Sequence, residues 1–284
     1  MEKAKEVAAY TLYIVILYFI LFVFWWLMIH FMNIGNDILD RILKSAGQLI
    51  AAIIILEIEH KKGESTASRV RASLRARFPS NLKLFFLAFL ATFSGMAFTV
   101  FLAVRSGALG LELAALAAGA MPTTLLNLTA LSVLSIITVA IGEEIIFRGL
   151  LLNRHHAILG SMPAALILNS ALFALVHFNF GFPLIILFIG SFLFGVSYVK
   201  FRNLFIPIAV HFAYNFSFFW FTIYDEQGAY PAVFVRTDGL PTEVAFGWYN
   251  IALSLVLILI VWALPQKWAQ LQPEETGEYP AETI

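Results

Sequence analysis

Long apolar runs separated by short polar segments recur along the whole chain. A helix needs about 20 apolar residues to cross the roughly 30 Å hydrocarbon core of a bilayer. Runs of that kind predict about eight membrane-spanning helices, at residues 8–32, 38–58, 82–104, 124–152, 161–178, 183–199, 203–222 and 246–264. No strand-like alternation of the sort found in membrane β-barrels recurs. The predicted fold is all-α, a polytopic membrane helix bundle.

Two stretches fit this pattern less well. The second run carries Asp40, Arg41 and Lys44 in its first half, and the apolar stretch 106–121 is short and contains Glu112. We expect residues 106–121 to form an interfacial or re-entrant helix. Residues 1–269 are predicted to form a single membrane-embedded domain. The acidic, proline-containing tail 270–284 is predicted to be disordered.

Composition supports the assignment to a membrane. Hydrophobic residues make up 61% of the chain and charged residues only 13%, whereas soluble proteins have roughly 45–50% and about 25%. Lipid must therefore solvate much of the surface. A formal net charge of zero argues against nucleic acid as a partner. The absence of cysteine excludes disulfides, thiolate metal sites and a cysteine nucleophile.

The distribution of Lys and Arg predicts the orientation in the membrane. The segment 60–83 carries seven basic residues against one acidic residue: Lys61, Lys62, Arg69, Arg71, Arg75, Arg77 and Lys83 against Glu64. The positive-inside rule assigns this basic loop to the cytoplasm. With eight spans, both termini also lie inside, and the net acidic loop 223–245 lies outside. The membrane would be the plasma membrane of a prokaryote or the endoplasmic reticulum of a eukaryote.

Ionisable residues within the predicted spans require an explanation, because each costs at least ~2.5–3.5 kcal/mol to insert. Three clusters stand out: Gly142-Glu143-Glu144-Ile145-Ile146-Phe147-Arg148 in the fourth span, Phe173-Ala174-Leu175-Val176-His177 in the fifth, and His211-Phe212-Ala213-Tyr214-Asn215 in the seventh.

Helical spacing separates the roles of the residues in these clusters. Glu144 and Arg148 are four residues apart on one helix face and are expected to form a structural ion pair. Glu143 is rotated by about 100° from Glu144 and has no such partner. His211 and Asn215, also four residues apart, face one direction.

The connection between the fourth and fifth spans brings two of the clusters together. Glu143 and His177 each lie 17 residues from a predicted turn at Gly160. At 1.5 Å per residue, antiparallel packing places both about 25 Å from that turn. The seventh span begins on the same side of the membrane, so His211 and Asn215 can reach the same cavity if the helices are neighbours.

These side chains form a plausible hydrolytic set. A carboxylate beside an imidazole in a small, water-containing pocket can remove a proton from water. A second imidazole and an amide can donate hydrogen bonds to an oxyanion. Because no serine or threonine occurs in a nucleophile-elbow pattern, direct attack of water on an amide is the simpler hypothesis.

The three motifs, E-E-x-x-x-R, F-x-x-x-H and H-x-x-x-N, occur in this order on separate predicted spans. In this respect the chain resembles the CAAX protease and bacteriocin-processing family, also called the ABI family or type II CAAX prenyl endopeptidases. The resemblance covers roughly residues 120–222. It implies a metal-independent intramembrane glutamate protease that needs no cofactor.

The resemblance also implies a role for each motif residue. Glu143 would be the general base and His177 its partner in activating water, while His211 and Asn215 would form the oxyanion site. Supporting residues would be Glu144, Arg148 and Phe173. The substrate would be a membrane-anchored protein or peptide, with or without a prenyl group, cleaved near its C-terminus. Prenyl-protein processing needs a site facing the cytosol, whereas the charge pattern places this cavity toward the outer half of the membrane. Processing of bacterial sorting signals or bacteriocins therefore stays open.

Three other hypotheses are less well supported. A zinc protease would be expected to show H-E-x-x-H, which is absent, and the adjacent His155 and His156 are expected to be solvated in a basic turn rather than to bind metal. A proton-coupled transporter would be expected to show an internal repeat, and none is evident. A non-catalytic immunity or scaffold protein that keeps the same fold is the third.

Overall fold

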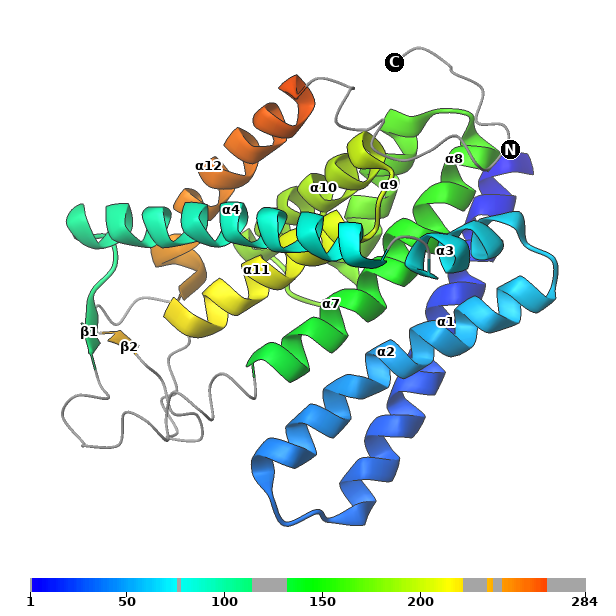
Figure 1. Cartoon of the computed structure of the whole chain (residues 1–284), viewed down its shortest axis with the longest axis horizontal. Helices are drawn as coiled ribbons and strands as arrows, with labels where there is room; N and C mark the ends of the chain where they lie inside the picture. Colours follow the sequence, from blue (N-terminus) through cyan, green and yellow to red (C-terminus); the bar gives the residue numbers. More distant parts are fainter. Residues whose placement is uncertain (1, 76–77, 114–131, 222–233, 237–241, 265–284) are drawn as a thin grey trace.

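The computed structural model describes residues 2–75, 78–113, 132–221, 234–236 and 242–264, and these form a helical bundle (Figure 1). The fold class predicted from the sequence is confirmed. Eight separate helices are α1 (Glu2–Met32), α2 (Asp37–Lys61), α3 (Ser65–Arg75), α4 (Phe78–Arg105), α9 (Met162–Leu175), α10 (Phe182–Phe201), α11 (Phe205–Phe221) and α12 (Thr242–Ala263). An uninterrupted helical stretch adds η1 (Ser132–Ile136), α7 (Ile137–Glu144), η2 (Ile145–Leu152) and α8 (Asn153–Leu159), of which η1 and η2 are π-helical.

Seven of the predicted spans each correspond to one separate helix, with ends shifted by a few residues, and the described part of the fourth, 124–152, lies in the stretch from η1 to α8. Residues 124–131 of that span lie outside the described part. Among the described residues, three helical segments are long and apolar enough to cross a membrane, namely Glu2–Met32, Ser80–Arg105 and Phe182–Phe201. Three further apolar helices are shorter: Met162–Leu175, Phe205–Phe218 and Gly247–Ala263. The chain is an integral membrane protein, and the number of times it crosses the bilayer stays a prediction.

The outer surface is suited to lipid. On α1, large apolar side chains such as Leu12, Ile16, Phe24 and Phe31 are exposed. A large exposed apolar surface marks contact with a membrane or with another protein. A core cluster shared by α1, α2, α4, η2, α9, α10 and α11 lies inside the bundle. The domain boundary at residue 269 and the disorder of the tail stay predictions, because residues 265–284 lie outside the described part.

The structure adds to one sequence prediction about the connecting segments and corrects part of another. The basic segment 60–83, predicted as a cytoplasmic loop, contains α3, whose Val70 packs against Gly149 of η2. The stretch 106–121 is not the predicted helix in its described part, residues 106–113. It turns at Gly107, which has φ +75°, and continues into β1 (Leu111–Leu113), whose backbone pairs antiparallel with β2 (Phe234–Arg236). Residues 114–121 lie outside the described part.

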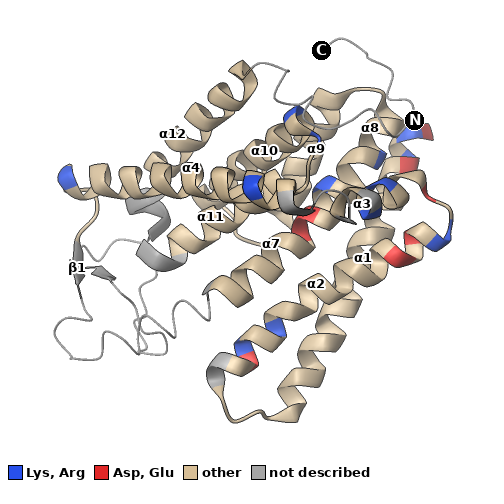
Figure 2. Cartoon of the chain, viewed as in Figure 1, with Lys and Arg blue, Asp and Glu red and all other residues tan. Residues whose placement is uncertain are grey.

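Contacts between the ends of helices place the connecting segments in two groups, one at each end of the bundle. Arg154, near the end of the helical stretch, forms ion pairs with Glu6 of α1 and with Glu64, next to α3. The β1–β2 pairing joins the segments after α4 and before α12, both of which the eight-span topology places outside. Figure 2 shows many Lys and Arg residues around the N-terminus, α3 and α8. The pairing of ends agrees with alternating spans, whereas the orientation stays a prediction.

His155 corrects another expectation, since it is neither solvated nor in a turn. The helix continues through α8 as far as Gly160, and α8 packs against α1. His155 is therefore fully buried, with a ring nitrogen 2.8 Å from the Thr11 hydroxyl. The turn itself lies where it was predicted, because Gly160 has φ +69° and Ser161 caps the start of α9.

The backbones of α7 and α2 approach closely at Gly142. A Cβ atom at this position would lie 2.8 Å from the carbonyl carbon and oxygen of Gln48, closer than side chains can pack. Small residues allow helices in membranes to come together in this way. Gly142 therefore holds α2 against the first predicted motif.

Replacing Gly142 with alanine is expected to destabilise the bundle by about 1–3 kcal/mol, because the added methyl group forces two backbones apart. The measurement is the thermal unfolding midpoint of the purified protein in detergent. Gly190→Ala in α10 is the matched control, since its Cβ would meet only the Phe194 Cζ atom, at 4.0 Å. Equal midpoints for the two variants would contradict the close approach.

The predicted orientation can be tested by cysteine labelling, because the chain has no native cysteine. A cysteine introduced by Arg236→Cys is expected to react with an impermeant maleimide in intact cells. One introduced by Lys61→Cys, at an exposed position at the end of α2, is expected to react only after permeabilisation. The reverse result would place the loop 223–245 in the cytoplasm and favour prenyl-protein processing.

Candidate active site

A completely buried arginine stands behind the site. Arg148 donates from Nη1 to Glu144 Oε1 at 2.9 Å, and from Nη2 to the carbonyl and hydroxyl oxygens of Ser191 at 2.8 and 2.6 Å. The predicted Glu144–Arg148 ion pair is therefore present. A buried charge is tolerated only when it is paired and hydrogen-bonded. The guanidinium consequently binds η2 to α10.

Aromatic rings enclose this ion pair. The Arg148 guanidinium carbon lies 4.8 Å from the Phe173 ring centroid and 5.2 Å from that of Phe194, within the range of cation–π attraction. Phe194 also stacks on the His211 ring, with centroids 4.7 Å apart. The aromatic residue of the second motif, Phe173, thus supports both the arginine and the neighbouring histidines.

The π-helical segment η2 leaves backbone carbonyl groups that need partners other than the regular helical ones. The side-chain amide of Asn153 donates to the carbonyl oxygens of Arg148 and Gly149, at 3.0 and 2.7 Å. Asn169 on α9 donates to the carbonyl oxygen of Phe147 at 2.9 Å. Irregular helix is tolerated at membrane depth where side chains satisfy its backbone, and short π-helical segments are frequent at functional sites.

Both motif glutamates lie near His211. Its Nδ1 is 2.8 Å from Glu144 Oε1, and its Nε2 is 3.8 Å from Glu143 Oε2. Glu144 is paired with Arg148, so its carboxylate accepts hydrogen bonds and His211 Nδ1 must be the donor. The remaining ring nitrogen, Nε2, faces Glu143. Spacing in the sequence did not predict this contact with Glu144.

The second histidine lies in the turn just after α9 and is oriented by the last turn of that helix. His177 Nδ1 lies 2.7 Å from the carbonyl oxygen of Phe173, and a carbonyl can only accept, so Nδ1 carries the proton. In the neutral ring, Nε2 then has a free lone pair. His177 is therefore set up to accept a proton or a hydrogen bond at Nε2.

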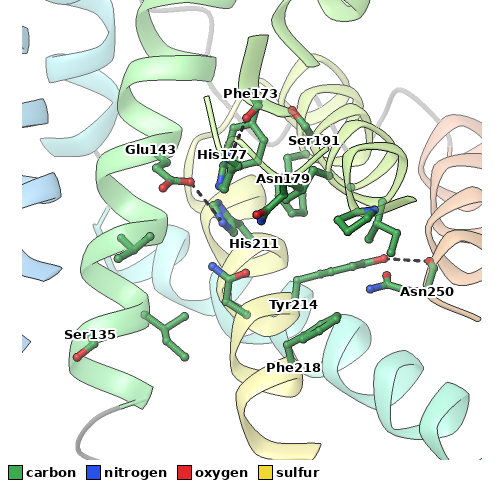
Figure 3. A pocket seen from close by; sticks show the side chains of 18 residues that line it. Ser135, Glu143, Phe173, His177, Asn179, Ser191, His211, Tyr214, Phe218 and Asn250 are labelled. Carbon is green, nitrogen blue, oxygen red and sulfur yellow. Dashed lines mark hydrogen bonds and ion pairs between the residues drawn. The ribbon is translucent and has the colours of Figure 1, made fainter. Parts of the chain in front are cut away.

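These groups border a cavity of about 450 Å³ (Figure 3). Figure 3 shows the Glu143 carboxyl group pointing toward the rings of His177 and His211. Residues from η1, α7, α9, α10, α11 and α12 line the cavity: Ser135, Ile136, Val139, Glu143, Phe173, His177, Asn179, Pro183, Ile186, Leu187, Gly190, Ser191, Phe194, His211, Tyr214, Asn215, Phe218 and Asn250. Of the predicted site residues, only Glu144 and Arg148 lie behind this lining.

Sequence reasoning missed Asn250, Ser191 and Tyr214. Asn250 is 1% exposed, and neither atom of its amide group has a hydrogen-bond partner among the described residues. Tyr214 donates to the backbone carbonyl of Asn250 at 3.4 Å. The only signal in the sequence is a polar residue within an apolar span. This signal is weak, because one asparagine or serine costs far less free energy to insert into a membrane than a charged residue does.

Within the described residues, no group of three or more His, Asp or Glu side chains is arranged to hold a metal ion. Two glutamates and one histidine do meet here, but Glu144 Oε1 is already bound by Arg148 and His211. The absence of a metal requirement stays a prediction about the reaction.

The comparison with known families identifies the central part of the chain. Residues 125–217 match the family described as Type II CAAX prenyl endopeptidase Rce1-like. The match spans all three motifs, from Glu143 to Asn215, and confirms the resemblance drawn from them. This segment of the chain is therefore similar to that peptidase family. No curated protein and no solved structure matches the chain.

Removing the buried cation is expected to destabilise the protein strongly. Arg148→Ala leaves the Glu144 charge uncompensated and is expected to lower the free energy of unfolding by about 3–5 kcal/mol. Arg148→Lys keeps the charge but cannot contact Glu144 and Ser191 through two separate nitrogens, so we expect a smaller loss. The free energy of unfolding of the two variants is measured by denaturation in detergent micelles.

The matched control is Arg154→Ala, which removes a partly exposed ion pair with Glu6 and should cost no more than about 1 kcal/mol. If Arg148→Ala proved as stable as Arg154→Ala, the buried network would not have the structural role assigned to it.

Proposed function

We propose that this protein is an intramembrane endopeptidase that hydrolyses a peptide bond near the C-terminus of a membrane-anchored protein or peptide. The observation that carries the proposal is the meeting of Glu143, His177 and His211 at one cavity within an Rce1-like domain. In the proposed reaction, water is the nucleophile and Glu143 is the general base.

Glu143 is suited to this role because its carboxylate is not committed elsewhere. Glu143 lines the cavity, and its buried Oε2 atom has no hydrogen-bond partner among the described residues, whereas Glu144 lies behind the cavity lining and is held through Oε1 by Arg148 and His211. Glu143 removes a proton from water as the water oxygen attacks the carbonyl carbon of the substrate. His177 Nε2 accepts the second hydrogen of that water as a hydrogen bond and so orients it.

His211 and Asn215 are proposed to stabilise the oxyanion that forms on the substrate. Because Nδ1 of His211 already donates to Glu144, donation from Nε2 requires the doubly protonated ring. Carboxylate oxygens of Glu144 and Glu143 lie on either side of the ring, 2.8 Å from Nδ1 and 3.8 Å from Nε2. Glu143 finally transfers its proton to the leaving nitrogen, which separates a carboxylate product from an amine product.

The cavity is suited to an apolar peptide. Most of its lining is apolar, which accommodates hydrophobic side chains or a prenyl group attached near the cleavage point. The unpaired amide of Asn250 offers one donor and one acceptor, the complement of a peptide unit. We propose that Asn250 binds the substrate backbone. Processing of C-terminal sorting signals or bacteriocins in the same cavity is the alternative substrate class, favoured by the predicted position of the site toward the outer half of the membrane.

Glu143→Gln is expected to lower cleavage by at least about 10²-fold, because it removes the base while keeping the shape of the side chain. The assay follows, by mass spectrometry, the release of the C-terminal fragment from farnesylated and unmodified membrane peptides in liposomes. The control is Glu57→Gln, which changes the partly exposed ion pair between Glu57 of α2 and Arg71 of α3. An unchanged biological effect of Glu143→Gln would support a non-catalytic immunity or scaffold protein instead.

The same assay tests metal independence. Dialysis against a strong chelator is expected to leave cleavage by the wild-type protein unchanged. Loss of activity that is restored by zinc would contradict the water-only mechanism, while the effect of Glu143→Gln alone would not distinguish the two.

A further inference from the structure

A second, smaller cavity lies on the other side of the Glu143–His177 pair. It has a volume of about 170 Å³ and lies between α1, α2, the α7–η2 helix and the end of α9. Its lining comprises Val15, Tyr18, Phe19, Phe22, Gln48, Glu143, Ile146, Phe147, Val176 and His177. Glu143 and His177 line both cavities, so these two side chains separate them.

Three buried oxygen atoms in the lining of this small cavity lack partners. They are the Tyr18 hydroxyl, Gln48 Oε1 and Glu143 Oε2, none of which has a hydrogen-bond partner among the described residues. An unsatisfied buried polar group costs about 1–3 kcal/mol, so three around one cavity call for a shared ligand. Dry cavities are apolar, whereas cavities that hold water offer each molecule two to four polar partners.

The fold places these groups together. The close contact of Gly142 with the backbone of Gln48 brings α2 beside Glu143. The α1–α2 hairpin, in blue at the lower right of Figure 1, supplies Tyr18 from the other helix of the pair. Neither helix belongs to the segment 125–217 that matches the family. Two of the three unpaired oxygens, those of Tyr18 and Gln48, are therefore a contribution of the first hundred residues.

We propose that the small cavity is a water chamber that supplies the nucleophile to Glu143 and His177, with Tyr18 and Gln48 as its positioning residues. This inference rests on the proposed function. Hydrolysis consumes one water for each bond cleaved, and an apolar substrate that fills the main cavity excludes solvent from that side. Water held behind the catalytic pair reaches Glu143 without passing the substrate.

The size and chemistry of the chamber agree with this role. Water takes about 30 Å³ per molecule in the liquid, so a cavity of about 170 Å³ holds several molecules. The Tyr18 hydroxyl can donate or accept, Gln48 Oε1 accepts, and the Glu143 carboxylate accepts. One water can therefore bridge Glu143 to either positioning residue within the chamber before it moves to the attacking position, where His177 Nε2 replaces that residue as the acceptor of its second hydrogen.

The first test separates turnover from substrate binding. Tyr18→Phe and Gln48→Leu are each expected to lower kcat about tenfold, the loss of one hydrogen bond of ~1.4 kcal/mol. KM should change by less than about twofold, because neither residue lines the main cavity. The matched control is Tyr13→Phe, also on α1, whose hydroxyl bonds Glu59 outside the chamber. Equal kcat for all three variants would overturn the assignment.

The second test detects water without using activity. Radiolytic footprinting of the full-length protein in nanodiscs generates hydroxyl radicals from bound water, so the buried Tyr18 ring is expected to be labelled. Val15→Phe, which fills the chamber, should abolish that labelling and leave the overall pattern unchanged. An unlabelled Tyr18 in the wild-type protein would mean a dry or lipid-filled cavity and would overturn the proposal.

The two proposals fail in distinguishable ways. If Glu143→Gln cleaves normally, the proposed catalytic function is wrong whatever the footprint shows. If Glu143→Gln is inactive but Tyr18→Phe and Gln48→Leu turn over as the wild type does, the catalytic function stands and the water chamber is wrong. A labelled Tyr18 together with low kcat and unchanged KM in both variants supports the chamber.

Discussion

The need to keep one guanidinium charged inside an apolar bundle organises the centre of this protein. Arg148 has no exposed surface, and its terminal nitrogens contact Glu144 on its own helix and Ser191 on α10. Glu144 in turn accepts from His211 on α11. One desolvated cation therefore ties three helices together through hydrogen bonds, and it does so in a medium where no water could replace them. The surrounding rings of Phe173 and Phe194 exclude solvent and add their own attraction for the cation.

Hydrogen bonds at the site also fix which ring nitrogen of each histidine carries a proton. The carboxylate of Glu144 holds the Nδ1 proton of His211, and the backbone of Phe173 holds that of His177. Both rings consequently turn Nε2 away from those anchors, toward the groups that line the cavity. Neither carboxylate oxygen of Glu143 is bound by Arg148, and among the described residues its buried Oε2 atom has no hydrogen-bond partner. A group left unsatisfied in a well-packed region is a candidate for function, because folding by itself would favour satisfying it.

The two cavities that meet at Glu143 and His177 differ in character. The larger is mainly apolar and suited to a peptide from the membrane, while the smaller gathers unpaired oxygens from α1 and α2. An enzyme that hydrolyses a bond within lipid has to bring together a substrate that avoids water and a nucleophile that is water. In the proposed mechanism, Glu143 and His177 separate the two cavities and have access to both, and the N-terminal helical hairpin contributes by lining the smaller one.

The amino-acid sequence by itself determined the helical class, the approximate ends of the helices, the Gly160 turn and the Glu144–Arg148 pair. These depend on local quantities: the length of apolar runs, the conformation of glycine, and the four-residue spacing of charges on a helix. It also singled out Glu143, by leaving it without a local partner. Only the tertiary structure decided that Glu144 holds His211, that Asn250 on α12 faces the same cavity, and that Tyr18 and Gln48 approach Glu143 from behind. It also showed that the segment 60–83 contains a helix and that His155 is buried against Thr11. Each of these depends on contacts between residues dozens of positions apart, and hydropathy and spacing carry no information about which helices become neighbours.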